Sequence, residues 1–439
     1  MNAYANVLKE KLTFLIREMS VAPAPYVKNP ESDFTRKKKL PFETVMHLLI
    51  SMGGNSLYKE LLEAQGYNVN TATTSAFVQQ RNKILPAAME FLFHAFTQSY
   101  ADIKDYRGYR LLAIDGSDLH IATDPSDKDT YFQSQPNTKG YNLLHLNAVY
   151  DLCNRLYVDA LVQPKRQLNE GKALAAMVDR SPIQGKTIVI ADRGYESYNN
   201  FAHLDRKGWN YIIRVKDLGS SGILSSLRLP VSGEFDQDVH LTLTRKQTKE
   251  AKARPGHKFL PTNSTFDFLD SHENMVYPMS FRVVRFVLPS GAYETVITNL
   301  STAEFPPYEL RCIYNMRWGI ETSFRALKYT VGLTNFHAKR QASIAQEIFA
   351  RMIMYNFAEM MTSHVVITQI DKRYPYQVNF TVAVHVCRHF LRSRGDDPLP
   401  DVEALIRKNI LPIRSVRQGQ ENTRKIRYKS AVSFVYRVA

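Results

Sequence analysis

Residues 186–195 read Lys-Thr-Ile-Val-Ile-Ala-Asp-Arg-Gly-Tyr, and this stretch decides the fold class. Its apolar part has no helical period and is rich in β-branched residues, which indicates a strand buried on both faces. Residues 110–114 (Arg-Leu-Leu-Ala-Ile) have the same form and precede Asp115-Gly116-Ser117. Two buried strands that each end in an aspartate and a turn predict an α/β sheet, and sites commonly form at such strand ends.

The rest of the chain divides around these two strands by its local pattern. Further strands are expected at 143–150 and 155–162, which form a hairpin, and at 211–215. Residues 217–300 are polar with strand-like alternation, which indicates a β-rich insertion. We therefore expect a helical domain at 1–105, an α/β core at 106–216 and 301–370, the insertion at 217–300 between its two parts, and a basic C-terminal region at 371–439.

The charge of the chain favours an acidic partner. Its 439 residues include 57 Lys and Arg against 42 Asp and Glu, a formal net charge of +15. Nucleic acid is the leading partner and an anionic membrane the second. The most apolar segment, 348–370, contains Arg351 and Glu359, so we expect a core helix and no membrane span. The three cysteines lie far apart and indicate neither a disulfide framework nor a zinc ribbon.

The N-terminal part contains one candidate for DNA reading. Residues 74–100 have helical periodicity, and Thr74 and Ser75 can cap this helix. The side chains around Arg81 form a polar face that either lies in a DNA groove or is simply solvated. We therefore regard Arg81 as a candidate DNA contact.

Residues 314–328 read Tyr-Asn-Met-Arg-Trp-Gly-Ile-Glu-Thr-Ser-Phe-Arg-Ala-Leu-Lys. At about 100° per residue, four polar side chains share a sector of roughly 60°, and Arg325 extends it. These four are Tyr314, Arg317, Glu321 and Lys328. Ile320, Phe324 and Leu327 fall on the opposite, apolar side. One acid among several bases on a single face is suited to binding a cation and a polyanion together.

Three carboxylates on three elements complete the candidate chemistry. Asp115, Asp192 and Glu321 would supply the hard oxygen ligands that Mg²⁺ prefers, with Mn²⁺ as a substitute. Two such metals can activate an attacking hydroxyl and stabilise a leaving oxygen. Each aspartate could instead be a turn cap or a structural ion-pair partner. Asp118 and Glu170 are rival carboxylates, although we favour Asp115.

The spacing Tyr-x2-Arg-x3-Glu-x6-Lys is similar to the YREK signature of DDE transposases of bacterial insertion sequences, specifically the insertion-sequence-four family. The segments at Asp115 and Asp192 resemble the two aspartate motifs of that family. The resemblance implies an α/β fold with an RNase H-like catalytic core, interrupted by a β-rich insertion. It also implies that Asp115, Asp192 and Glu321 hold the metals.

The same resemblance implies which side chains hold DNA. Tyr314, Arg317 and Lys328 would contact phosphates near the transposon end, and Trp318 and Arg325 would help to hold the cleaved end. Arg193, beside the second aspartate, joins the expected DNA contacts. Some members of the family capture a flipped base on an aromatic side chain of the insertion. Candidates for that role are Phe235, Phe259 and Phe266, for each of which core packing is the alternative.

We therefore expect a transposase that cleaves the terminal inverted repeats of its element and joins the 3′-hydroxyl ends to target DNA. Its partners are double-stranded DNA and a second copy of the chain on that DNA, with no membrane. The expected location is the bacterial cytoplasm, in association with the nucleoid. Two alternatives stay open: a structure-specific nuclease or resolvase with the same triad, and a domesticated transposase that only binds DNA.

Overall fold

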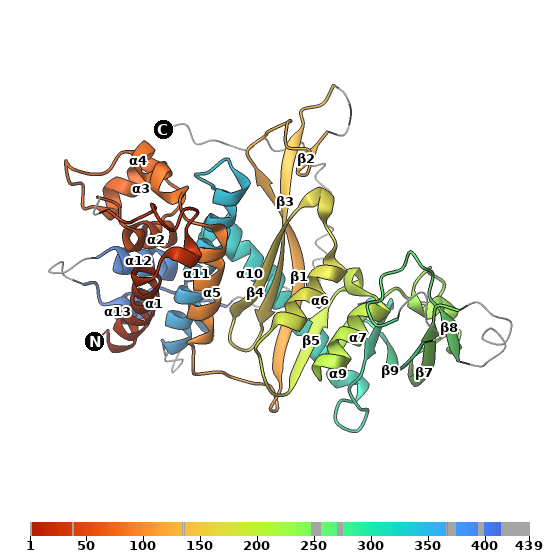
Figure 1. The fold of residues 1–439 in the computed structure, drawn as a ribbon. Helices are drawn as coiled ribbons and strands as arrows, with labels where there is room; N and C mark the ends of the chain where they lie inside the picture. The colour runs from red at the N-terminus through yellow and green to blue at the C-terminus, as the bar shows by residue number, and fades with distance from the viewer. Residues whose placement is uncertain are drawn as a thin grey trace.

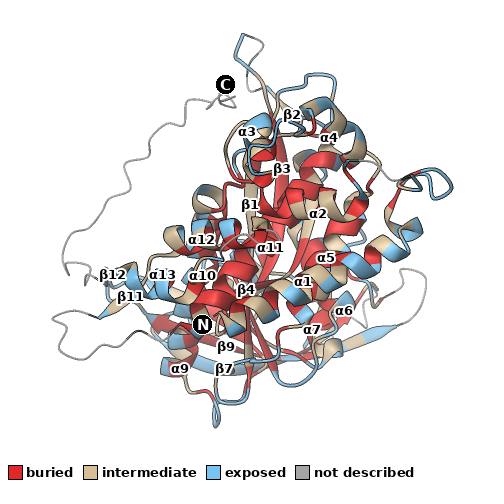
Figure 2. Cartoon of the chain, turned by 90° about the vertical axis from the view of Figure 1, so that its left-hand side faces the viewer, coloured by how far each residue is buried: buried red, intermediate tan, exposed pale blue. Residues whose placement is uncertain are grey.

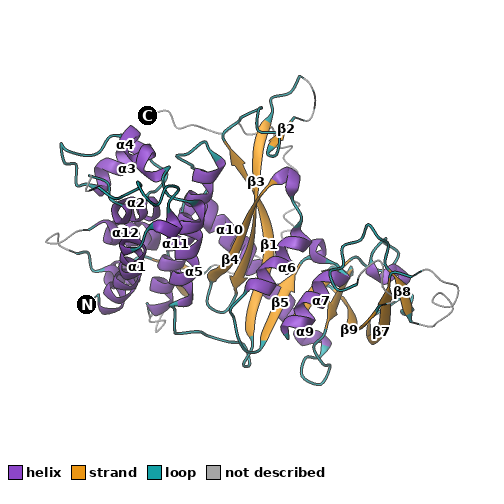
Figure 3. Cartoon of the chain, in the orientation of Figure 1, coloured by secondary structure: helices purple, strands orange, loops and turns teal. Residues whose placement is uncertain are grey.

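A large mixed sheet separates two layers of helices (Figures 1 and 3). The computed structural model describes residues 2–36, 39–133, 135, 137–246, 256–269, 275–365, 367, 375–393 and 399–413. Part of the expected basic C-terminal region, 414–439, lies outside the described residues.

The sheet has ten strands in the order β2-β3-β1-β5-β6-β10-β9-β7-β8, with β4 paired to β3. The strands are β1 (Arg110–Ile121), β2 (Tyr131–Phe132), β3 (Tyr141–Asp151), β4 (Leu156–Pro164), β5 (Thr187–Ala191), β6 (Asn210–Val215), β7 (Phe235–Thr244), β8 (His257–Phe259), β9 (Val276–Val287) and β10 (Tyr293–Thr298). The pairs β1–β5 and β5–β6 are parallel, whereas β1–β3 and β3–β4 are antiparallel. The expected strands at the centre and the expected hairpin are confirmed.

Helices from both ends of the chain share one layer. The helices are α1 (Ala3–Val21), α2 (Phe42–Ser51), α3 (Leu57–Ala64), α4 (Thr74–Arg81), α5 (Pro86–Gln98), α6 (Glu170–Arg180), α7 (Tyr198–Lys207), α9 (Pro307–Met316), α10 (Trp318–Arg325), α11 (Gln341–His364), α12 (Phe380–Arg392) and α13 (Val402–Lys408). Short 3-10 helices lie at Ala24–Tyr26 (η1), Lys165–Gln167 (η2), Arg193–Tyr195 (η3) and Ile223–Ser226 (η4), a π-helical turn lies at Ala326–Thr330 (η5), and β11 (Tyr376–Val378) pairs with β12 (Ile410–Pro412). In Figure 1, α11–α13 lie beside the N-terminal helices, and α11 and α12 both contact α2.

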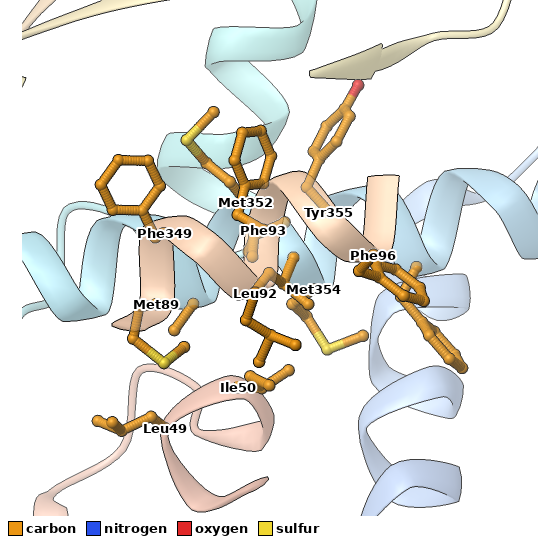
Figure 4. Close-up of a cluster of buried hydrophobic side chains, with 14 of the residues drawn as sticks. Leu49, Ile50, Met89, Leu92, Phe93, Phe96, Phe349, Met352, Met354 and Tyr355 are labelled. Atoms are coloured by element: carbon orange, nitrogen blue, oxygen red, sulfur yellow. The ribbon is translucent and has the colours of Figure 1, made fainter. Parts of the chain in front are cut away.

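The alternation of side chains along β1 assigns each face of the sheet to its own core. Ala113 and Leu119 belong to the cluster shared with α5 and α11, while Leu112 and Ile114 belong to the cluster under α6 and α7. Figure 2 shows α11 as an almost wholly buried helix, which confirms the core helix expected in this region. The close-up in Figure 4 shows its methionines packed among aromatic and aliphatic side chains of α2 and α5. No helix in the described part of the chain is long and apolar enough to cross a membrane.

Two local expectations differ from the structure. The helix expected at 74–100 is divided into α4 and α5, because Pro86 lacks an amide hydrogen and starts a new helix at its first position. The cap of α4 is Thr73, whose hydroxyl accepts a hydrogen bond from the Ala76 amide at 3.2 Å, so Thr74 and Ser75 are not the capping residues.

The residues expected as an insertion continue the central sheet. Strand β10 pairs with β6, and β9 and β7 follow it in the same sheet. Leu243 and Phe281 join the apolar cluster beneath α6 and α7. The described residues of 217–300 therefore share their core with the rest of the sheet.

Candidate active site

Asp115 lies within a strand and not at its end. Strand β1 continues to Ile121, because its antiparallel pairing with β3 extends beyond this point. Its parallel pairing with β5, however, ends at Ile114 opposite Ala191. Asp115 is therefore the first residue after this parallel ladder on β1, and Asp192 is the first residue after it on β5. The expected strand end is wrong for β1, but the two aspartates still lie at the same edge of the β1–β5 pair.

Asp192 is held by an arginine that the sequence reasoning did not single out. The side chain of Arg214 on β6 places Nη2 2.6 Å and Nε 2.8 Å from Asp192 Oδ1. The same oxygen caps η3 by accepting a hydrogen bond from the Arg193 amide. An arginine in an otherwise apolar strand, at residues 211–215, was the signal available in the sequence.

Glu321 lies on α10 and meets Asp115 through Arg317. Arg317 Nη2 is 2.7 Å from Glu321 Oε1, and Nη1 is 3.5 Å from Asp115 Oδ2. Arg317 is only 5% exposed. One buried guanidinium thus links the carboxylate of the strand to the carboxylate of the helix.

Asp115 lies close enough to Asp192 and Glu321 for their charges to affect its pKa. Burial raises the pKa of Asp115 to about 6. In this net value, the Gly116 amide and the Arg317 guanidinium lower the pKa, whereas the negative charges of Glu321 and Asp192 add to the effect of burial. A carboxyl with a raised pKa despite a nearby arginine is short of positive charge, and a bound cation would supply it.

The donor chemistry of the site fits a divalent metal. Asp115, Asp192 and Glu321 offer only carboxylate oxygens, the ligand type that Mg²⁺ and Mn²⁺ prefer. Within the described residues, however, no three His, Cys, Asp or Glu side chains are already gathered at metal-binding distances. In this arrangement Asp192 pairs with Arg214, and Glu321 pairs with Arg317.

The expected DNA contacts around Glu321 fall into two groups. Tyr314 and Arg317 are buried at 5% exposure each, and burial raises the pKa of Tyr314 to about 12. Trp318 is 57% exposed, and Arg325 is also exposed. The single helical face expected for these residues is therefore half buried, while the predicted burial of Ile320, Phe324 and Leu327 is confirmed.

Lys328 and Arg193 lie on two different elements, one after α10 and one after β5. Lys328 lies in the π-helical turn η5, and its Nζ donates a hydrogen bond to the Asp118 carbonyl at 2.9 Å. This bond ties the end of the α10 segment to β1. Arg193 is exposed beside Asp192 in η3.

Arg81 is not a surface residue, and its expected role in a DNA groove is wrong. The side chain is 2% exposed, with Nη1 2.7 Å from Glu347 Oε1 and Nη2 donating to the Ser343 carbonyl. Burying a guanidinium requires such partners, because an unpaired charge in the interior is costly. Arg81 instead joins α4 to α11.

The rival carboxylates Asp118 and Glu170 lie on the other face of β1. Asp118 pairs with His145 at 2.6 Å and with Lys165 at 2.8 Å, and these hydrogen bonds, against the effect of burial, lower its pKa to about 2. Glu170 Oε1 is 3.4 Å from His145 Nε2. A Cβ at position 116 would lie 2.2 Å from that nitrogen, which explains the glycine there.

The aromatic candidates for base capture differ in burial. Phe266 is 4% exposed within an apolar cluster, whereas Phe235 and Phe259 are partly exposed. For Phe266, this position corresponds to core packing.

The fold and candidate site together are those of an α/β protein with one acidic side chain on β1, one just after β5 and one on α10, beside the arginines Arg214 and Arg317. Residues 106–357 match the model of the transposase DDE domain family, and the chain belongs to that family of insertion-sequence transposases. It is 25% identical over 185 residues, 40% of its length, to "Putative transposase InsZ" of Escherichia coli (strain K12), and this match spans 61% of that relative.

A solved structure gives a further, more distant comparison. The piggyBac transposase in a synaptic complex with hairpin DNA aligns with 96% of this chain and 86% of its own, with a TM-score of 0.43 and 12% identity.

Proposed function

We propose that this transposase cleaves the ends of its element by divalent-metal-dependent phosphodiester hydrolysis and transfers the resulting 3′-hydroxyl ends to target DNA. The observation that supports the proposal is that Arg317 lies 3.5 Å from Asp115 and 2.7 Å from Glu321, while Asp192 follows the same β1–β5 ladder as Asp115. Mg²⁺, with Mn²⁺ as a substitute, would supply charge neutralisation and an activated hydroxyl at these oxygens when bound.

The protein side chains would then position DNA. Arg317 bridges two of the carboxylates and is rigidly held, so it can orient them and neutralise a nearby phosphate. Trp318 and Arg325 are exposed on α10, where an aromatic face and a guanidinium can hold a separated DNA end. Arg193 and Lys328 would contact the backbone on either side, and the Tyr314 hydroxyl, buried and unpaired among the described residues, would meet a bound phosphate.

The sheet supports an RNase H-like assignment of the core. Strands β4, β3 and β1 are antiparallel, β1, β5 and β6 are parallel, and the acidic residues lie on β1, just after β5 and on a later helix. We further propose double-stranded DNA as the substrate, in keeping with a net charge of +15. A homodimer on DNA would bring two ends together. The helical N-terminal region would bind DNA through surfaces other than Arg81.

The test is cleavage of DNA that carries the sequences flanking the coding region, by the purified full chain with Mg²⁺ or Mn²⁺. Asp192→Asn should abolish cleavage and leave DNA binding largely intact. Asp129→Asn, an exposed aspartate outside the site, is the matched control and should cleave normally. Cleavage by Asp192→Asn would refute the metal assignment, and cleavage without joining to a target plasmid would indicate a nuclease or resolvase.

A further inference from the structure

A polar pocket that contains none of Asp115, Asp192 and Glu321 lies beside η5, the turn that follows α10. Its volume is about 570 Å³. It is lined by the turn after α2, by α3, by the end of η5 with the segment that follows it, and by one face of α12, all in the helical layer. Its lining includes Gly53, Gly54, Tyr329, Gly332, Arg388 and Arg392.

The pocket is lined by two arginines, Arg388 and Arg392, and by two carboxylates, Glu60 and Glu63. Arg392 is paired with Glu60 and Glu63. Among the described residues, no carboxylate lies within ion-pair distance of Arg388 or of its neighbour Arg351. Arg351 donates to the backbone carbonyls of the α2 turn, which satisfies its hydrogens but not its charge.

Arg388 is the centre of this imbalance. It is 7% exposed, its Nη2 donates to the Val331 carbonyl, and its Nε has no hydrogen-bond partner. Burial and the nearby charges of Arg351 and Arg392 lower its pKa to about 9, while Glu60 opposes this effect. A buried guanidinium with a free donor and like charges around it gains free energy when an anion binds.

The backbone around Arg388 is also shaped for close approach. A Cβ at Gly53 would lie 3.1 Å from Arg388 Nη1, and Gly332 has a φ of +90°. Gly53 leaves room beside the guanidinium, and Gly332 permits a left-handed backbone conformation in the pocket wall. His385 and His389 add ring nitrogens at the mouth, and Tyr329 is 73% exposed there.

We propose that this pocket binds a phosphate group, and that in the working protein this is a backbone phosphate of bound DNA. The guanidinium fork of Arg388 matches phosphate oxygens. The pocket follows directly on η5, which carries Lys328, so a strand held at the site can continue into it. The DNA source rests on the proposed function, whereas phosphate binding itself does not.

The test uses the full chain, with inorganic phosphate and a DNA duplex of unrelated sequence as probes. Phosphate should raise the melting temperature of the wild-type protein and not that of Arg388→Met. The variant should also lower the slope of log affinity for the duplex against log salt by about one. Arg407→Met, which removes an exposed arginine of α13, controls for net charge and should behave as the wild type does.

A second variant keeps the test decisive if Arg388→Met fails to fold. Thr381→Glu places a carboxylate at the exposed rim of the pocket and leaves every arginine in place. It should also abolish the phosphate effect. If the variants lose the phosphate-induced rise in melting temperature but keep the wild-type salt slope, the ligand is free phosphate and not a backbone phosphate of DNA. An unchanged phosphate effect in the variants would overturn the pocket itself. Neither readout depends on cleavage, so failure of the proposed reaction would remain distinguishable.

Discussion

At the scale of single residues, the chemistry of the candidate site depends on the surroundings of Asp115. Its half-buried carboxyl lies near two other acids, accepts a hydrogen bond from the Gly116 amide at 2.8 Å, and is 3.5 Å from Arg317. The three acids could be proposed as site residues from the sequence, because strand patterns and the Tyr-Arg-Glu-Lys spacing each lie within a short segment of the chain. Arg214 could not be predicted in the same way, because its role follows from the parallel pairing of β5 with β6.

The raised pKa of Asp115 predicts that replacing its carboxyl group increases the free energy of unfolding, by an amount that depends on pH. Since the folded pKa of about 6 exceeds the unfolded value, the carboxyl destabilises the metal-free fold increasingly as pH rises from about 4 to 6, and fully above that. Asp115→Asn should therefore stabilise the metal-free protein by about 2 kcal/mol at pH 7.5 and by much less at pH 4. Denaturant unfolding at the two pH values measures this, and an equal effect at both would contradict it.

At the scale of elements, the ends of helices and strands depend on backbone details that cannot be predicted from the periodicity of apolar residues. The pattern of residues 74–100 is helical throughout, yet Pro86 divides it and Thr73 caps its first part. Likewise, β1 extends beyond Asp115 because β3 pairs with it for ten residues, and only the long-range register reveals this. The apolar side of α10 was predicted correctly because three buried residues at helical spacing suffice.

The cap assignment gives a prediction for α4. Thr73→Ala removes the hydroxyl that accepts the Ala76 amide hydrogen and should cost about 1 kcal/mol of unfolding free energy. Thr74→Ala is the matched control, one residue further on, and should cost less because it removes no cap. Both are measured by urea unfolding. If the Thr74 variant were the more destabilised, the cap would have been assigned to the wrong threonine.

At the scale of the whole molecule, buried ion pairs join parts of the chain that are distant in sequence. Arg81 on α4 and Glu347 on α11 are each about 2% exposed at their side chains, and burial of Glu347 is outweighed by His337 and Arg81, which lower its pKa to about 2. The sequence could not show this, because an arginine among glutamines has the same local pattern on a surface and at a helix contact.

This pair predicts a large loss of stability on removal of one partner. Arg81→Ala should cost about 3–5 kcal/mol, because Glu347 would remain buried without its cation. The double variant Arg81→Met, Glu347→Leu should recover much of that loss. Chemical denaturation checks both. A fully stable Arg81→Ala protein with weakened DNA binding would instead restore the surface interpretation.

The most direct test of the carboxylate site is Mn²⁺ binding to the full chain without DNA, measured by electron paramagnetic resonance. The account predicts that the wild-type protein binds Mn²⁺, that Asp115→Asn and Asp192→Asn lose most of this binding, and that Asp118→Asn retains it. Undiminished binding in Asp115→Asn together with loss in Asp118→Asn would show that the metal site lies on the other face of β1, and would contradict the account.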